Sequence, residues 1–216
     1  TAFALPYGLF QLVYGPLGDR FGKLTIIVFA LAASAVFTLA CALAGGIGML
    51  ALLRFMAGVA TAAVVPLSMA FIADHFAYEV RQPVIARYLN GLIMGQIAGG
   101  SLGGIMAELF GWRVIFVIFG VIVGAMAYLV WRFSNHHRET LRAAPLRGRK
   151  LFAPYVALLR QRRPRHVIIT ATIEGFFFFG GGAFIGAFLH HTFGIGYAWV
   201  GVMLACFGIG SLIYSN

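Results

Sequence analysis

Long apolar runs separated by short polar gaps constrain this chain more than any other feature. A helix needs roughly 20 apolar residues to cross the hydrocarbon core of a bilayer, which is about 30 Å thick. Seven runs approach or exceed that length, and they are continuous rather than alternating, which favours helices over transmembrane strands. Membrane-spanning helices are therefore predicted at 2–18, 24–44, 49–73, 84–107, 112–132, 166–188 and 197–214.

The composition supports this interpretation. Of the 216 residues, 61% are hydrophobic and 10% are charged, whereas about a quarter of an ordinary soluble domain is charged. So few charges exclude both a soluble globule and a disordered chain. The net charge of +10 does not indicate a nucleic-acid partner, because the basic residues lie in short gaps between apolar runs and form no groove. We predict an all-α, polytopic integral membrane protein.

The basic residues also predict the orientation of the chain. Fourteen of the 16 fall within 19–23, 74–87 and 132–165, the gaps that share one side of the predicted membrane. Arg113 lies on the other side and Arg54 lies within a span. Since cytoplasmic loops carry the excess of Lys and Arg, the side with the fourteen is predicted to be cytoplasmic.

The longest gap is a basic stretch at 133–165, which separates five predicted spans from two. It is either a solvated linker or a surface that binds anionic lipids. Its apolar segment at 151–159 is expected to lie on the membrane as a short helix.

The ends and the cysteines add two expectations. Thr1 lies within an apolar run without an initiator methionine, and Asn216 follows soon after another run, so we expect a fragment without a visible signal peptide. Cys41 and Cys206 both lie within apolar runs, which indicates neither a disulfide framework nor a metal cluster. We predict no metal, no cofactor and no catalytic site.

A charged turn joins the first two predicted spans. Gly18 and Gly22 allow a sharp reversal and close helix approach. Asp19 and Arg20 place opposite charges where the helix termini present their dipoles. Its key residues are Gly15, Gly18, Asp19, Arg20, Gly22 and Lys23.

The string GPLGDRFGK at 15–23 closely resembles the signature loop of the major facilitator superfamily, although Leu24 replaces a frequent basic residue. Further segments resemble that family in order and spacing: Arg54 followed four residues later by Gly58, Ile72-Ala73-Asp74, the glycine-rich 91–100, and Gly111-Trp112-Arg113. The resemblance implies helices 2 to 8 of twelve. It divides the chain into an N-terminal bundle (1–132), a cytoplasmic linker (133–165) and the start of a C-terminal bundle (166–216).

The glycine-rich segment is expected to form a ridge along one helix. Glycines four residues apart share a face, and small residues allow close helix packing in lipid. The ridge comprises Gly91, Gly95, Gly99 and Gly103, widened by Gly100 and Gly104. The resemblance implies an antiporter motif that seals the cavity, whereas simple helix packing is the alternative. Gln96 replaces the family's proline and is expected either to face cargo or to bond across to another helix.

Charges inside the predicted spans are candidates for a transport pathway, because burying them is costly. Arg54 lies roughly 8 Å into its span; it either snorkels to the surface or, as the resemblance implies, serves a proton pathway by stabilising a carboxylate. Glu174 is expected to carry a proton, to contact a cationic substrate or to make a structural hydrogen bond. Asp74, Asp19 and Arg20 are expected to form a gating cluster, in which Arg20 or Arg87 pairs with Asp74.

The resemblance implies a secondary transporter rather than an enzyme, with proton-coupled efflux of drugs or other small molecules by alternating access. The alternatives are an uptake carrier for a sugar, organic acid or osmolyte, and a non-transporting scaffold or sensor. Small-molecule substrates, protons and membrane lipids are the expected partners, and the full-length protein is expected to act as a monomer in the bacterial inner membrane.

Overall fold

The computed structural model describes residues 2–136, 160–196, 199–200, 202–203 and 206. Every regular element within these ranges is an α-helix, which confirms the predicted all-α class. The predicted span at 197–214 falls mainly outside the described residues, as does the expected surface helix at 151–159. The helices are α1 (Ala4–Phe21), α2 (Lys23–Cys41), α3 (Ile47–Thr61), α4 (Val64–His75), α5 (Tyr78–Phe110), α6 (Trp112–His136) and α8 (Arg162–Phe193).

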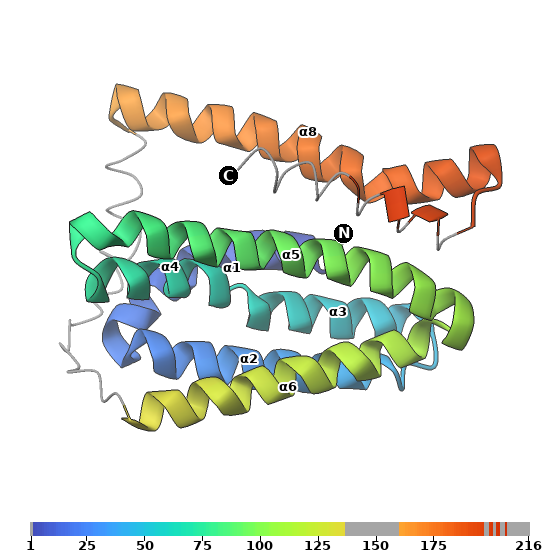
Figure 1. The fold of residues 1–216 in the computed structure, drawn as a ribbon, viewed down its shortest axis with the longest axis horizontal. Helices are drawn as coiled ribbons and strands as arrows, with labels where there is room; N and C mark the ends of the chain where they lie inside the picture. The colour runs from blue at the N-terminus through green and yellow to red at the C-terminus, as the bar shows by residue number, and fades with distance from the viewer. Residues whose placement is uncertain (1, 137–159, 197–198, 201, 204–205, 207–216) are drawn as a thin grey trace. The chain divides into compact units, whose positions relative to one another are not determined.

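Helices occupy the positions of the first six predicted spans (Figure 1). Four segments of the described chain are long and apolar enough to cross a membrane: α2, α3 together with α4, α5 and α6. Length and apolar composition thus support a multi-pass membrane protein.

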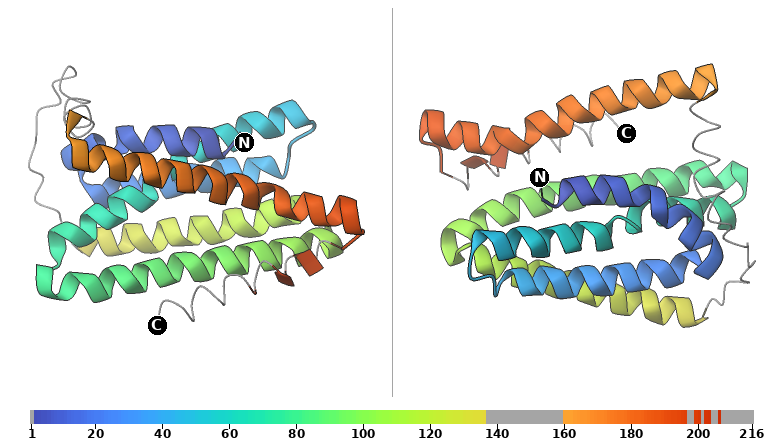
Figure 2. Two further views of the ribbon diagram at one scale, coloured as in Figure 1. Left: turned by 90° about the horizontal axis from the view of Figure 1, so that it is seen from above. Right: turned by 180° about the vertical axis from the view of Figure 1, so that it is seen from behind.

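The chain divides into two compact units, each of which is described by itself. The first comprises Thr1–Gln96 and Met106–Ala144, and the second comprises Ile97–Ile105 and Pro145–Asn216. In the first unit α1 packs on α3, α3 on α2, and α2 on α6. The right-hand view of Figure 2 shows these four helices in that order across the bundle, and α4 contacts both α1 and α2.

The core of the first unit lies where α2 meets α4. Ile27 and Ala30 of α2 are buried against Ala63 and Leu67, with Tyr14 of α1 packed at the edge. Gly18 of α1 is buried beside Leu67, and a methyl group at this position would overlap the leucine side chain. The close helix approach that was predicted for Gly18 is therefore confirmed.

Two one-residue turns reverse the chain. Gly22 joins α1 to α2 with φ of 89° and donates its N–H to the Gly18 carbonyl at 3.0 Å. Gly111 joins α5 to α6 with φ of 80°. Residues with a Cβ rarely adopt positive φ, so both reversals require glycine. The sharp turn predicted at Gly22 is confirmed.

The span predicted at 49–73 differs from the expectation, because two helices fill it instead of one. α3 ends at Thr61 and α4 begins at Val64. Pro66 has no N–H for the carbonyl of residue 62, four positions earlier, so the helical hydrogen-bond ladder is interrupted there. The break leaves Ala62 and Ala63 fully buried.

In the second unit α8 runs from Arg162 to Phe193, and Gly194 caps it in a left-handed conformation with φ of 65°. The Gly194 N–H bonds to the His190 carbonyl at 3.0 Å. This αL cap satisfies one of the carbonyls at the end of the helix.

Candidate functional site

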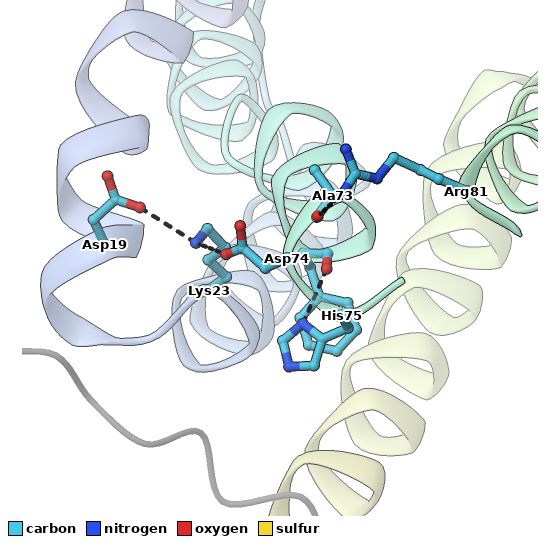
Figure 3. A network of polar contacts seen from close by, with 7 residues as sticks. Asp19, Lys23, Ala73, Asp74, His75 and Arg81 are labelled. Atoms are coloured by element: carbon cyan, nitrogen blue, oxygen red, sulfur yellow. Dashed lines mark hydrogen bonds and ion pairs between the residues drawn. The ribbon is translucent and has the colours of Figure 1, made fainter. Parts of the chain in front are cut away.

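The charged turn and the end of α4 meet in an ionic arrangement that we name the charged bridge: Asp19, Lys23 and Asp74. Lys23 Nζ lies 3.3 Å from Asp19 Oδ1 and bonds to Asp74 Oδ2. The lysine side chain is 15% exposed, whereas Asp19 and Asp74 are 62% and 53% exposed. Figure 3 shows one ammonium group between two carboxylates from different helices. The bridge ties together the ends of α1 and α4 through the first residue of α2.

The structure brings Asp19 and Asp74 together as predicted, but the cation between them differs from the expected one. Lys23, rather than Arg20 or Arg87, pairs with Asp74. The Arg20 guanidinium lies over the Phe21 ring, 5.1 Å from its centroid. Asp19 belongs to α1 and Lys23 begins α2, so the reversal of the chain at Gly22 brings the lysine to both acids, whereas Arg20 points elsewhere on α1.

Arg81 of α5 caps the end of α4, next to the charged bridge. Its Nη2 donates to the carbonyl of Ala73, in the last turn of α4, at 2.6 Å (Figure 3). The same atom donates to the carbonyl of Phe76, just beyond the end of α4, at 3.1 Å. These carbonyls lack helical partners, and a basic side chain there also complements the helix dipole. The charge count of the sequence included Arg81 but missed this capping role, although a basic residue just past a helix end is its usual signal.

A second cation lies within the apolar part of the first unit, in a group that we name the Arg54 bracket: Arg54, Thr38, Phe3 and Phe116. Arg54 Nη2 donates to Thr38 Oγ1 at 3.4 Å. Its guanidinium carbon lies 4.7 Å from the centre of the Phe116 ring and 5.5 Å from that of Phe3. Four elements therefore meet here: α3, α2, α6 and the start of α1.

The spacing of Arg54 and Gly58 now has a physical reason. The two residues share a face of α3, because they lie four positions apart. A methyl group at Gly58 would overlap the Phe3 carbonyl oxygen and lie 3.0 Å from Pro6 Cγ. The glycine lets the backbone at Phe3 approach α3, and that approach brings the Phe3 ring to Arg54.

A pair of hydroxyls, one from buried Ser34 and one from half-buried Thr61, extends this polar region toward the break between α3 and α4. Ser34 of α2 and Thr61 of α3 lie 2.7 Å apart, oxygen to oxygen. The Thr61 hydroxyl donates its hydrogen to the Ala57 carbonyl at 2.8 Å, so its oxygen accepts the hydrogen bond from the Ser34 hydroxyl. Such bonds help to hold helices together in lipid, where apolar surfaces alone supply no water-driven force.

The other predicted site residues lie elsewhere. Gly15 lies within α1. Gln96 has an exposed side chain on α5, and Glu174 has one on α8 of the second unit. Five glycines of the predicted ridge face open space in the described chain, because an added Cβ would meet no neighbouring atom within 4 Å: Gly91, Gly95, Gly99, Gly100 and Gly103. Gly104 also lies on α5.

Comparison with known proteins gives a family. The sequence profile of the Major Facilitator Superfamily matches residues 1–215. A bicyclomycin resistance protein homolog of Haemophilus influenzae is 26% identical over 84% of this chain and 44% of its own length. The 4-hydroxybenzoate transporter PcaK of Pseudomonas putida is 29% identical over 54% of this chain and 27% of its own length. A gallate transporter of the same organism is 29% identical over 56% of this chain and 27% of its own length.

The chain thus spans between about a quarter and a half of the length of these relatives. The match along nearly the whole chain agrees with the apolar helices, the one-residue turn at Gly22 and the charged bridge. The chain belongs to the major facilitator superfamily, a family of multi-pass membrane transporters rather than enzymes.

Proposed function

We propose that the protein is a proton-coupled secondary transporter that exports drugs or other small molecules by alternating access. The single observation that carries this proposal is the charged bridge, which ties three helix ends together through one lysine. Exposed ion pairs contribute at most about 1 kcal/mol each. Such a bridge is strong enough to favour one arrangement of the helices and weak enough to break in each transport cycle.

The fourteen basic residues in the gaps at 19–23, 74–87 and 132–165 support a cytoplasmic position for the charged bridge. In this orientation the bridge acts as a gate on the cytoplasmic side, and opening separates Lys23 from one or both acids. The resistance protein among the relatives supports export. The protein is proposed to act as a monomer in a bacterial inner membrane, with protons and lipids as its further partners.

The gate is tested by Asp19→Asn in the full-length protein. This substitution removes one carboxylate from Lys23 while preserving shape, so we expect transport to be abolished and membrane insertion to remain intact. Glu79→Gln is the matched control, because it removes an exposed negative charge from the start of α5 without touching the bridge. Normal transport by Asp19→Asn would reject the gating role.

Proton coupling is tested separately through Glu174, an acid within α8. If Glu174 carries the proton, Glu174→Gln removes the pH dependence of transport. If it contacts a cationic substrate instead, the same variant loses selectivity for cations. Unchanged transport at every pH would leave Glu174 with a structural role.

A carrier for organic acids is the second candidate function. The names of the 4-hydroxybenzoate and gallate transporters favour it, as does an intramembrane arginine whose described contacts are a hydroxyl and two rings. Flux in proteoliposomes that contain the full-length protein distinguishes the candidates. Efflux driven by an opposing proton gradient supports export, accumulation driven by a parallel gradient supports uptake, and no flux with any probe supports a scaffold or sensor.

A further inference from the structure

Arg54 is an unusual charge for its position. It lies two turns into α3, roughly 10 Å from the start of the helix. A charged side chain at such depth is costly, and arginines in membrane spans generally pair with an anion or with backbone carbonyls. The described contacts of Arg54 supply neither.

The contacts of Arg54 leave part of its hydrogen-bonding capacity unused. A guanidinium group carries five N–H donors, and Thr38 accepts one bond from Nη2. The rings of Phe3 and Phe116 interact with the positive charge through their π faces, but they accept no ordinary hydrogen bond. Nε is buried and has no hydrogen-bond partner within the described chain. A buried donor without a partner is destabilising.

We infer that Arg54 binds a carboxylate of the transported substrate, with Thr38 as the residue that positions the guanidinium. A carboxylate is planar and accepts two parallel N–H bonds from one guanidinium, so it matches the donor edge that includes Nε. One guanidinium balances one negative charge, and the two phenylalanine rings offer an apolar surface. The ligand class is therefore an apolar monocarboxylate, such as an aromatic acid.

This inference rests on the proposed transport function and adds to it a residue and a chemical class. Two sources supply the same carboxylate chemistry: a substrate, or an acidic side chain of the protein itself. A substrate carboxylate competes with other added carboxylates, whereas a side chain already paired with Arg54 excludes them. Direct binding of a small acid to the purified full-length protein distinguishes the two sources.

The probe is radiolabelled benzoate, measured by equilibrium dialysis against the full-length protein in nanodiscs. We expect saturable binding that unlabelled benzoate displaces and that benzamide, its neutral analogue, does not. Arg54→Gln is expected to weaken binding roughly 10- to 100-fold, which is the effect of losing hydrogen bonds to a charged group. Arg54→Lys retains the charge without the planar fork, so we expect it to bind with intermediate affinity.

A second pair of variants keeps the charge in place. Thr38→Val removes the hydroxyl that holds Nη2 and is expected to weaken benzoate binding several-fold, whereas Thr38→Ser retains the hydroxyl and is expected to restore it. Thermal unfolding of each variant verifies the fold. If Arg54→Gln fails to fold, the comparison of Thr38→Val with Thr38→Ser still tests the inference. Equal affinities of these two variants for benzoate would contradict the role of Thr38 in positioning the guanidinium.

The inference is overturned if the wild-type protein does not bind benzoate, or if folded Arg54→Gln binds it as the wild type does. Efflux of ethidium, a cationic probe, reports the proposed function independently. A protein that exports ethidium under a proton gradient without binding benzoate refutes the inference and leaves the transport proposal standing. Loss of ethidium export in Arg54→Gln, without benzoate binding in the wild type, assigns Arg54 to an acid of the protein. A protein with no flux of either probe refutes the transport proposal.

Discussion

The charged bridge and the Arg54 bracket hold their cations in opposite ways. Lys23 lies between two exposed carboxylates at the ends of helices. Arg54 lies among a hydroxyl and two aromatic rings inside the apolar part of the first unit. In the charged bridge, where water reaches both carboxylates, opposite charges pair with little net gain in stability. Around the half-buried Arg54, π faces and a hydroxyl surround the cation, and its buried Nε is left for a ligand.

The same contrast extends to the glycine beside each group. A methyl group at Gly18, near the charged bridge, would overlap the terminal methyl groups of the Leu67 side chain. A methyl group at Gly58, near Arg54, would overlap the backbone carbonyl of Phe3. A side chain can change rotamer, but a backbone carbonyl can yield only if α1 shifts. The glycine beside the Arg54 bracket is therefore expected to tolerate an added methyl group less well than the glycine near the charged bridge.

The largest expected effect tests this difference in tolerance. We expect Gly58→Ala to lower the free energy of unfolding by about 3 kcal/mol, the upper part of the usual range for overpacking. The matched variant Gly18→Ala is expected to cost about 1 kcal/mol, because Leu67 can adjust. Unfolding of the full-length protein in mixed micelles measures both. Equal losses would show that the two contacts yield to the same extent.

Removal of the cap on α4 is expected to have the next largest effect. Arg81→Gln loses charge-assisted bonds to the carbonyls of Ala73 and Phe76, which costs about 1.5 kcal/mol. Arg87→Gln is the control, since it lies at the same end of α5 and has an exposed side chain. Hydrogen exchange at the end of α4 should rise in Arg81→Gln alone. The same rise in both variants would attribute the effect to net charge.

A smaller effect concerns the ion pair itself. A double-mutant cycle with Lys23→Gln and Asp74→Asn is expected to give a coupling of about 0.5 to 1 kcal/mol at low salt. The coupling should shrink at 1 M salt, where the Debye length falls to about 3 Å. Asp74 is 53% exposed, so screening reaches the pair. A coupling that is unaffected by salt would contradict its surface character.

The smallest effect is expected for the hydroxyl pair next to the Arg54 bracket. Ser34→Ala removes the bond to Thr61 and is expected to cost about 0.6 kcal/mol, the average for hydrogen bonds between membrane helices. Because Ser34 is 5% exposed, added salt should not change this loss. Thr25→Ala, on the first turn of the same helix, is the control for a hydroxyl loss near the surface. Salt dependence of the Ser34→Ala loss would place that pair in contact with water.

The sequence predicted features that depend on local physics. Apolar runs of membrane length predicted the helices, because each run can satisfy its own backbone hydrogen bonds in lipid. Glycine at position 22 predicted the one-residue turn, since positive φ is a property of that residue. The resemblance of 15–23 to a known signature indicated that Asp19 and Asp74 lie together.

Other features depended on how helices distant in sequence pack together. The sequence offered Arg20, Lys23, Arg81 and Arg87 as basic residues near Asp74, and the tertiary structure alone selected Lys23 as its partner and Arg81 as the cap. The surroundings of Arg54 come from three other elements, the start of α1, α2 and α6. A side chain's partner depends on its direction and on which helix lies opposite. Composition and spacing within one helix do not determine either of these, whereas they do determine that an apolar run of this length forms a helix.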